Sequence, residues 1–158
     1  MKVNRMMDKA SYACRLQVPA SAVWRFLEWP NLELMIPSGF ISKVEYDERK
    51  AVIGATRWVW LGDGRRIRER LEASSEHQDD MAFDYRIIDT ADFPLAEYWG
   101  SVRLTPAGDN ACSLRFSCEF TPIGISAQEW TSIYIEMQKM QTAFIEKAAK
   151  STSAHSHP

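Results

Sequence analysis

The chain has 158 residues, 46% of them hydrophobic and 25% charged, and its formal net charge is −2 at pH 7. These values are ordinary for one globular domain with its own core, and the near-neutral charge argues against nucleic-acid binding. No apolar run reaches the length of a membrane span, and residues 1–10 lack the apolar centre of a secretory signal, so we expect no integral membrane association.

The cysteines and histidines indicate neither a metal site nor a disulfide framework. Cys14, Cys112 and Cys118 are odd in number and match no metal-binding spacing, which favours reduced thiols in a cytoplasmic protein. His77 falls in a polar turn, and the other two histidines fall in the Ser/His/Pro segment at the C-terminus. We therefore expect no metal, no cofactor and no histidine-based catalysis.

The first part of the chain predicts a strand, two short helices and a second strand. Apolar residues alternate in the strands and recur at helical spacing before Pro30, while Asn31 can cap the second helix and Pro37 can end it. The expected ranges are 11–18 for the strand, 22–29 and 32–36 for the helices, and 41–46 for the next strand.

The stretch 54–74 predicts a β-hairpin whose loop is 62–64, because the last glycine of that loop can adopt the left-handed conformation. In this register Arg57 faces Glu69, whereas a two-residue turn would pair Trp58 with Glu69. One face of the hairpin then carries Arg57, Val59, Leu61, Arg65, Ile67 and Glu69, and the other carries Trp58, Trp60, Arg66 and Arg68.

The two faces of the hairpin call for different explanations. Tryptophan and arginine suit a face in water, where a guanidinium can lie on an indole ring. If the other face is buried, Arg57 and Glu69 must satisfy each other, since a lone buried charge is very costly. The pair is either a polar spot in an apolar pocket or an ordinary cross-strand ion pair near a sheet edge.

The rest of the chain predicts three strands, over 81–88, 98–104 and 112–120, followed by a long helix. Alternation on the last strand turns Leu114 and Phe116 inward. A capping box at 126–129 begins the helix, which we expect to fray near Lys150. Its expected buried stripe is Trp130, Ile133, Tyr134, Met137, Met140, Gln141, Phe144 and Ala148.

This order predicts an α+β fold in which a curved seven-stranded antiparallel sheet wraps around the C-terminal helix, with the two short helices between strands 1 and 2. The helix, roughly 35 Å long by its rise, cannot fill the curved sheet alone, so a pocket should remain. We expect a flexible N-terminus over 1–10, a single domain over 11–150 and a disordered tail over 151–158.

Short motifs accompany this order of elements from about residue 10 to 150. They are Val18-Pro-Ala-Ser-Ala-Val-Trp24, Trp29-Pro-Asn31, Gly54-Ala-Thr-Arg57, Gly62-Asp-Gly64, Ile67-Arg-Glu-Arg-Leu71, Tyr85-Arg-Ile87, Phe93-Pro94, Leu104-Thr-Pro106 and Phe120-Thr-Pro122. Together they resemble the START/Bet v 1-like (helix-grip, SRPBCC) superfamily, and within it the bacterial polyketide cyclase/dehydrase and lipid-transport group.

The resemblance implies a hydrophobic cavity between the sheet and the long helix, with its mouth framed by the 61–64 turn, the 89–95 loop and that helix. It implies that Glu69 and Tyr98 line the cavity. It would also turn Arg115 inward, but alternation turns this side chain outward, and we favour alternation because a row of buried polar residues would be expensive.

Our first hypothesis is that the cavity binds a small hydrophobic or aromatic metabolite, lipid- or polyketide-like. Each residue proposed to line it could equally be an ordinary core residue, and both a monomer and a homodimer fit the sequence. The proposed lining is Arg57, Val59, Ile67, Glu69, Phe83, Tyr85, Tyr98, Val102, Phe116, Met137, Met140 and Phe144.

Two alternative functions are open. One is a polyketide cyclase/dehydratase-like enzyme, with Glu69 as general acid or base, Tyr98 orienting a carbonyl and Arg57 holding an enolate or carboxylate. The other is a protein-interaction domain that uses the face formed by Trp58, Trp60, Arg66 and Arg68, since tryptophan and arginine are common at binding hot spots.

Overall fold

The computed structural model describes residues 6–77, 79–91 and 93–155. Its elements are β1 (Asp8–Leu16), α1 (Ala20–Leu27), the 3₁₀ helix η1 (Trp29–Ser38), β2 (Ile41–Tyr46), β3 (Thr56–Leu61), β4 (Arg66–His77), β5 (Asp80–Asp89), β6 (Leu95–Pro106), β7 (Cys112–Pro122) and α2 (Ala127–His155). In this part of the chain the strands form one antiparallel seven-stranded sheet in the order β1-β7-β6-β5-β4-β3-β2.

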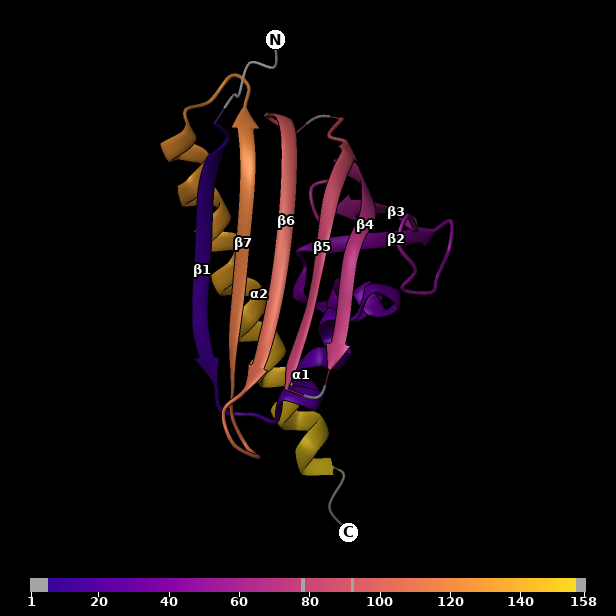
Figure 1. The fold of residues 1–158 in the computed structure, drawn as a ribbon, viewed down its shortest axis with the longest axis vertical. Helices are drawn as coiled ribbons and strands as arrows, with labels where there is room; N and C mark the ends of the chain where they lie inside the picture. The colour runs from indigo at the N-terminus through magenta and orange to yellow at the C-terminus, as the bar shows by residue number, and fades with distance from the viewer. Residues whose placement is uncertain (1–5, 78, 92, 156–158) are drawn as a thin grey trace.

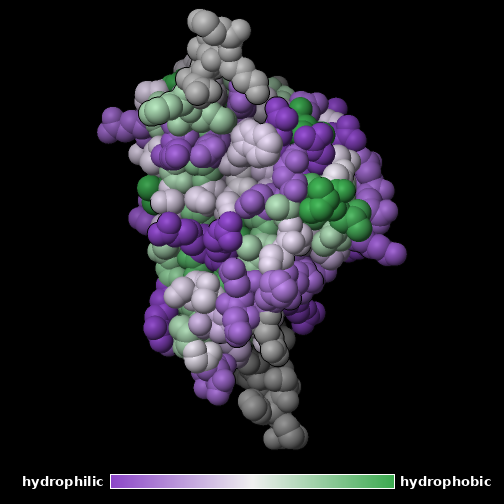
Figure 2. Space-filling view, viewed as in Figure 1, coloured by the Kyte–Doolittle hydropathy of each residue, from purple (hydrophilic) through white to green (hydrophobic). Residues whose placement is uncertain are grey.

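The sheet curves around α2, which confirms the predicted helix-grip architecture. In Figure 1, α2 lies behind β1, β7 and β6, while β2 and β3 run across the direction of these strands. The short helices α1 and η1 pack against α2 on the inner side of the curved sheet. The opposite face of the sheet carries mainly hydrophilic side chains, as Figure 2 shows.

The hairpin of β3 and β4 has the predicted register. Arg57 pairs with Glu69 across the two strands, and the Leu61 amide donates to the Arg65 carbonyl oxygen over 2.7 Å. Gly64 has a φ of 92°, the left-handed conformation that closes a three-residue loop. The alternative pairing of Trp58 with Glu69 is therefore wrong.

Alternation on β7 also holds. Leu114, Phe116 and Cys118 are buried, whereas Arg115 is exposed. The inward position that the family resemblance implied for Arg115 is wrong, because the inner face of β7 continues the apolar core and has no partner there for a charge.

Both ends of the folded region extend further than expected. β1 begins at Asp8, which pairs with Phe120, so residues 8–10 form part of a strand instead of a flexible end. α2 continues beyond Lys150 to His155, so the expectation of disorder is wrong for 151–155. The expectations for 1–5 and 156–158 lie outside the described residues.

The helical segments differ from the prediction in their bounds and in one packing face. α1 begins at Ala20, and Pro30 lies in the first turn of η1 instead of ending a helix. On α2, Ile133 and Met140 are exposed, and the buried row is Trp130, Tyr134, Gln138, Thr142, Ile145 and Ala149. The prediction from apolar residues alone therefore placed the buried face of α2 incorrectly, because the buried row includes two polar side chains.

The cap of α2 provides a test of local helix stability. Ser126 Oγ accepts a hydrogen bond from the Glu129 amide over 3.0 Å, which is one half of the predicted capping box. We expect Ser126→Ala to lower the free energy of unfolding by about 1 kcal/mol, and Ser126→Gly to lower it by only a few tenths. Chemical denaturation of both variants checks this; equal losses would show that the hydroxyl does not cap α2.

Candidate functional site

A cavity of about 100 Å³ lies between the inner face of the sheet, α1, η1 and α2. Strands β2 to β7 supply one wall because their inward side chains alternate with outward ones. The predicted residues that line this cavity are Arg57, Val59, Ile67, Glu69, Phe83, Tyr85, Tyr98, Val102, Phe116 and Met137. The structure therefore brings together side chains that are scattered over 81 positions of the sequence.

Two predicted lining residues lie elsewhere. Met140 is 59% exposed on the outer side of α2. Phe144 is half-buried and packs edge-on against Phe26, with the ring centroids 6.2 Å apart, and it does not line the cavity. The predicted positions of Met140 and Phe144 are therefore wrong, and for one reason. Both residues were predicted from the apolar stripe of α2, but the helix is rotated so that a different face packs on the sheet.

Other lining residues were not predicted for this role. They are Phe26, Leu27, Leu32, Met35, Phe40, Ile41, Leu61, Ile87, Phe93, Trp130, Gln138 and Gln141. The apolar members carry the ordinary signal of core residues, and Trp130 and Gln141 belonged to the predicted helix stripe. Gln138 carries no sequence signal at all, because a glutamine on a helix is usually exposed.

Arg57 and Glu69 form a buried ion pair on the cavity wall. Arg57 Nε donates to Glu69 Oε1 over 2.8 Å, and the two side chains are only 4% and 9% exposed. Arg57 Nη1 donates to the Trp29 carbonyl oxygen over 2.7 Å, and its guanidinium lies 3.8 Å from the centroid of the Trp29 ring. The interpretation of this pair as a surface ion pair at a sheet edge is therefore wrong.

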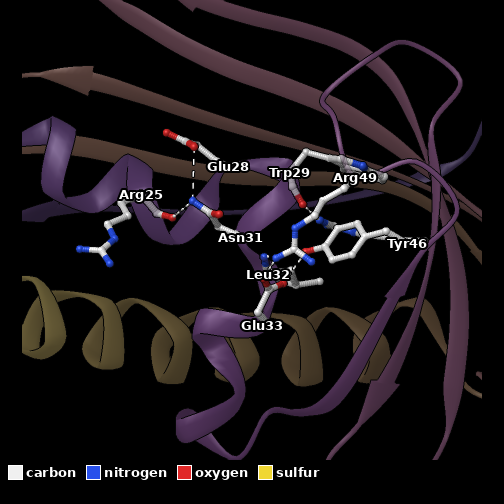
Figure 3. A network of polar contacts seen from close by, with 9 residues as sticks. Arg25, Glu28, Trp29, Asn31, Leu32, Glu33, Tyr46 and Arg49 are labelled. Carbon is white, nitrogen blue, oxygen red and sulfur yellow. Dashed lines mark hydrogen bonds and ion pairs between the residues drawn. The ribbon is translucent and has the colours of Figure 1, made fainter.

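Polar contacts hold η1 in place, so that its apolar side chains form part of the wall. Tyr46 Oη accepts from the Leu32 amide over 3.0 Å and donates to Glu33 Oε2 over 2.7 Å, and Glu33 also pairs with Arg49 (Figure 3). The Asn31 side chain donates to a carbonyl oxygen in the last turn of α1 over 3.0 Å. Burial raises the pKa of Tyr46, which keeps this hydroxyl protonated and able to donate.

Two tyrosines place hydroxyl groups in the cavity. The Tyr85 and Tyr98 hydroxyl oxygens lie 3.2 Å apart. The Tyr85 ring lies over Gly100, where a Cβ atom would come within 2.3 to 2.6 Å of three ring and hydroxyl atoms. Glycine at this position therefore makes room for the ring. Burial raises the pKa of both phenols well above their usual range, so both remain donors at neutral pH.

The outward face of the hairpin is a ladder of cations and rings. The Arg66 guanidinium lies 4.4 Å from the Trp58 ring centroid, and Lys43 Nζ lies 4.7 Å from the Trp60 ring centroid. Arg68 pairs with Asp47 over 2.7 Å. Each ring already has a cation against it, and a role of this face in protein interaction stays a prediction.

Comparisons with known proteins agree with this geometry. Residues 7–155 match the family described as polyketide cyclase/dehydrase and lipid transport, and the chain belongs to that family. Its fold is the helix-grip fold of the START/Bet v 1-like superfamily. A search of curated proteins gave no match. None of the described helices is both long and apolar enough to span a membrane.

Solved structures share the fold at low sequence identity. An uncharacterised protein from Bacillus thuringiensis is 19% identical with a TM-score of 0.76, over 90% of this chain and 98% of that one. The protein XoxI from Bacillus cereus is 18% identical with a TM-score of 0.76, over 93% and 99%. A point mutant of norcoclaurine synthase from Thalictrum flavum is 16% identical with a TM-score of 0.69, over 96% and 99%. At these identities the likeness shows the fold alone.

The buried pair can be tested with a double-mutant cycle. Arg57→Met leaves the Glu69 carboxylate buried and unpaired, and Glu69→Leu does the same to Arg57, so each change should lower the free energy of unfolding by about 3–5 kcal/mol. The double variant should recover most of that loss, because no unpaired charge is left. Chemical denaturation measures all four proteins, and losses that simply add would contradict the proposed coupling.

Proposed function

We propose that this protein binds a small, mostly apolar metabolite, about one aromatic ring in size, in the cavity between the sheet and α2. The observation that carries the proposal is the composition of the cavity wall. Apolar and aromatic side chains surround a few polar residues, namely the buried Arg57, Glu69 and Tyr98 and the half-buried Tyr85. Ligand pockets characteristically combine such a wall with a few polar groups that orient the ligand.

The buried pair supports this proposal on energetic grounds. Replacing a buried ion pair with well-packed apolar residues is often neutral or stabilising, so stability alone gives weak reason for Arg57 and Glu69 to be here. A ligand that carries a polar group gives them a further role, because the pair offers it an acceptor and a donor at one end of an apolar space. Membership of a family described by polyketide and lipid chemistry is consistent with such a ligand.

The cavity volume limits the size of the ligand. Pockets for drug-sized ligands occupy about 300–1,000 Å³, whereas an apolar cavity of about 150 Å³ can hold benzene. The cavity here, at about 100 Å³, is smaller than that, so a single ring is the largest ligand we expect, and its entry requires small shifts of the lining side chains. A long lipid or a multi-ring polyketide would require η1 or α2 to move outward.

A second candidate function is catalysis of a cyclase- or dehydratase-like reaction. It is favoured by the position of Glu69 and Tyr98 on the wall of the same cavity, where a carboxylate and a protonated phenol could act as base and hydrogen-bond donor. If Glu69 transfers a proton, Glu69→Gln should lower kcat by about 100-fold or more for any substrate that the wild type converts. Full turnover by this variant would remove Glu69 from the mechanism.

We infer a cytoplasmic location and no nucleic-acid partner. The three cysteines are free, and Cys112 and Cys118 are buried. Burial raises the pKa of each of these two thiols to about 11, so they should be unreactive at neutral pH. The net charge of −2 supports the absence of a nucleic-acid partner. A measurement of the protein's mass in solution, by light scattering, distinguishes a monomer from a homodimer.

Two methionines on α2 allow a matched test of cavity binding. Met137 lines the cavity and Met140 is exposed, so Met137→Trp should fill the space while Met140→Trp leaves it open. We expect single-ring phenols to raise the melting temperature of the wild type and of Met140→Trp but not of Met137→Trp. Ligand at 100 times its Kd should add about 2.7 kcal/mol to the free energy of unfolding. Equal shifts in all three proteins would place the ligand outside this cavity.

A further inference from the structure

Gln138 is a buried polar residue on the α2 wall of the cavity. Its side chain is on the lining, the residue is 6% exposed, and its Oε1 atom has no hydrogen-bond partner. Thr142, one turn further along the same buried row, instead donates its hydroxyl to the Lys139 carbonyl oxygen over 3.1 Å. Gln138 therefore differs from its buried polar neighbour in having an acceptor that the protein leaves unused.

An unused buried acceptor needs an explanation, because most buried polar side-chain atoms have a partner in the protein or in ordered water. Three other buried atoms in the described part of the chain lack partners: Trp29 Nε1, Arg68 Nε and Trp130 Nε1. Trp29 and Arg68 do not line the cavity. Trp130 does, but its ring nitrogen lies by the Cys118 sulfur, a weak acceptor. Of the two that line the cavity, Gln138 is thus the one whose unpartnered atom is an acceptor.

We infer that Gln138 Oε1 accepts a hydrogen bond from a hydroxyl or amino group of the bound metabolite. This inference rests on the proposed function and narrows its ligand to a hydroxylated or amino-bearing ring compound. Arg57 and Glu69 belong to the sheet wall and Gln138 to the helix wall, so the ligand meets polar groups on both walls. Gln138 thereby sets specificity: a ring without a donor leaves the buried oxygen unpaired.

The consequence is a preference between ligands of nearly the same shape. A site built to hydrogen-bond a hydroxyl rejects an analogue that lacks it, because the polar group of the site is then left without a partner. The phenol p-cresol and its methyl ether, 4-methylanisole, differ in whether the oxygen can donate, and the ether is larger by one methyl group. We expect wild-type protein to bind p-cresol at least about 10-fold more tightly than 4-methylanisole.

The test uses these two probes with the full chain and two variants. Gln138→Leu removes the acceptor and keeps a similar volume, while Gln128→Leu makes the same change at an exposed position of α2. Isothermal titration calorimetry gives the ratio of the two Kd values for each protein. We expect Gln138→Leu to lower the preference for p-cresol about 10-fold, with 4-methylanisole bound as well as before, and Gln128→Leu to leave it unchanged.

The melting temperature without ligand supplies a second readout. Removing an unpaired buried polar group should leave it unchanged or raise it, whereas removing a structural hydrogen bond would lower it. Two results with Gln138→Leu would overturn the inference: an unchanged ratio of Kd values, or a marked fall in melting temperature. Equal affinities of the wild type for the two probes would also overturn it, and would indicate that a water molecule donates to the Gln138 oxygen instead. If neither probe binds the wild type, the single-ring proposal fails as well.

Discussion

The buried contact between Arg57 and Glu69 is the constraint on which the rest of the site depends. It joins β3 to β4, and through the Trp29 carbonyl oxygen and ring it joins both strands to the start of η1. One guanidinium therefore connects the curved end of the sheet to the short helix that closes the cavity. Because removal of either charge would leave the other unpaired in an apolar wall, the three elements are held in one arrangement.

The register of one hairpin determines which side chains reach the cavity. Since strand side chains alternate, a shift of one residue between β3 and β4 would bring Trp58 opposite Glu69, and Arg57 and Glu69 would then point to opposite faces of the hairpin. The loop over 62–64 prevents this shift, because Gly64 adopts the left-handed conformation that the three-residue connection needs. The polar end of the cavity thus follows from a turn at the far end of the same hairpin.

Those parts of the fold that follow local rules were predictable from the sequence. The hairpin loop, the alternation on β7 and the Ser126 cap each depend on residues close together in the chain. The placement of Met140 and Phe144 was wrong because helix rotation is set by contacts with distant strands, and apolarity alone did not reveal it. Gln138 was missed for the same reason: its burial comes from the packing of α2 on the sheet.

A crystal structure of the protein soaked with p-cresol would test the central claim most directly. The account predicts density for one ring between the sheet and α2, with the Arg57–Glu69 contact intact and the phenol oxygen within hydrogen-bond distance of Gln138 Oε1. A cavity that stays empty or is filled by protein side chains, with p-cresol absent or bound only on the surface, would contradict it.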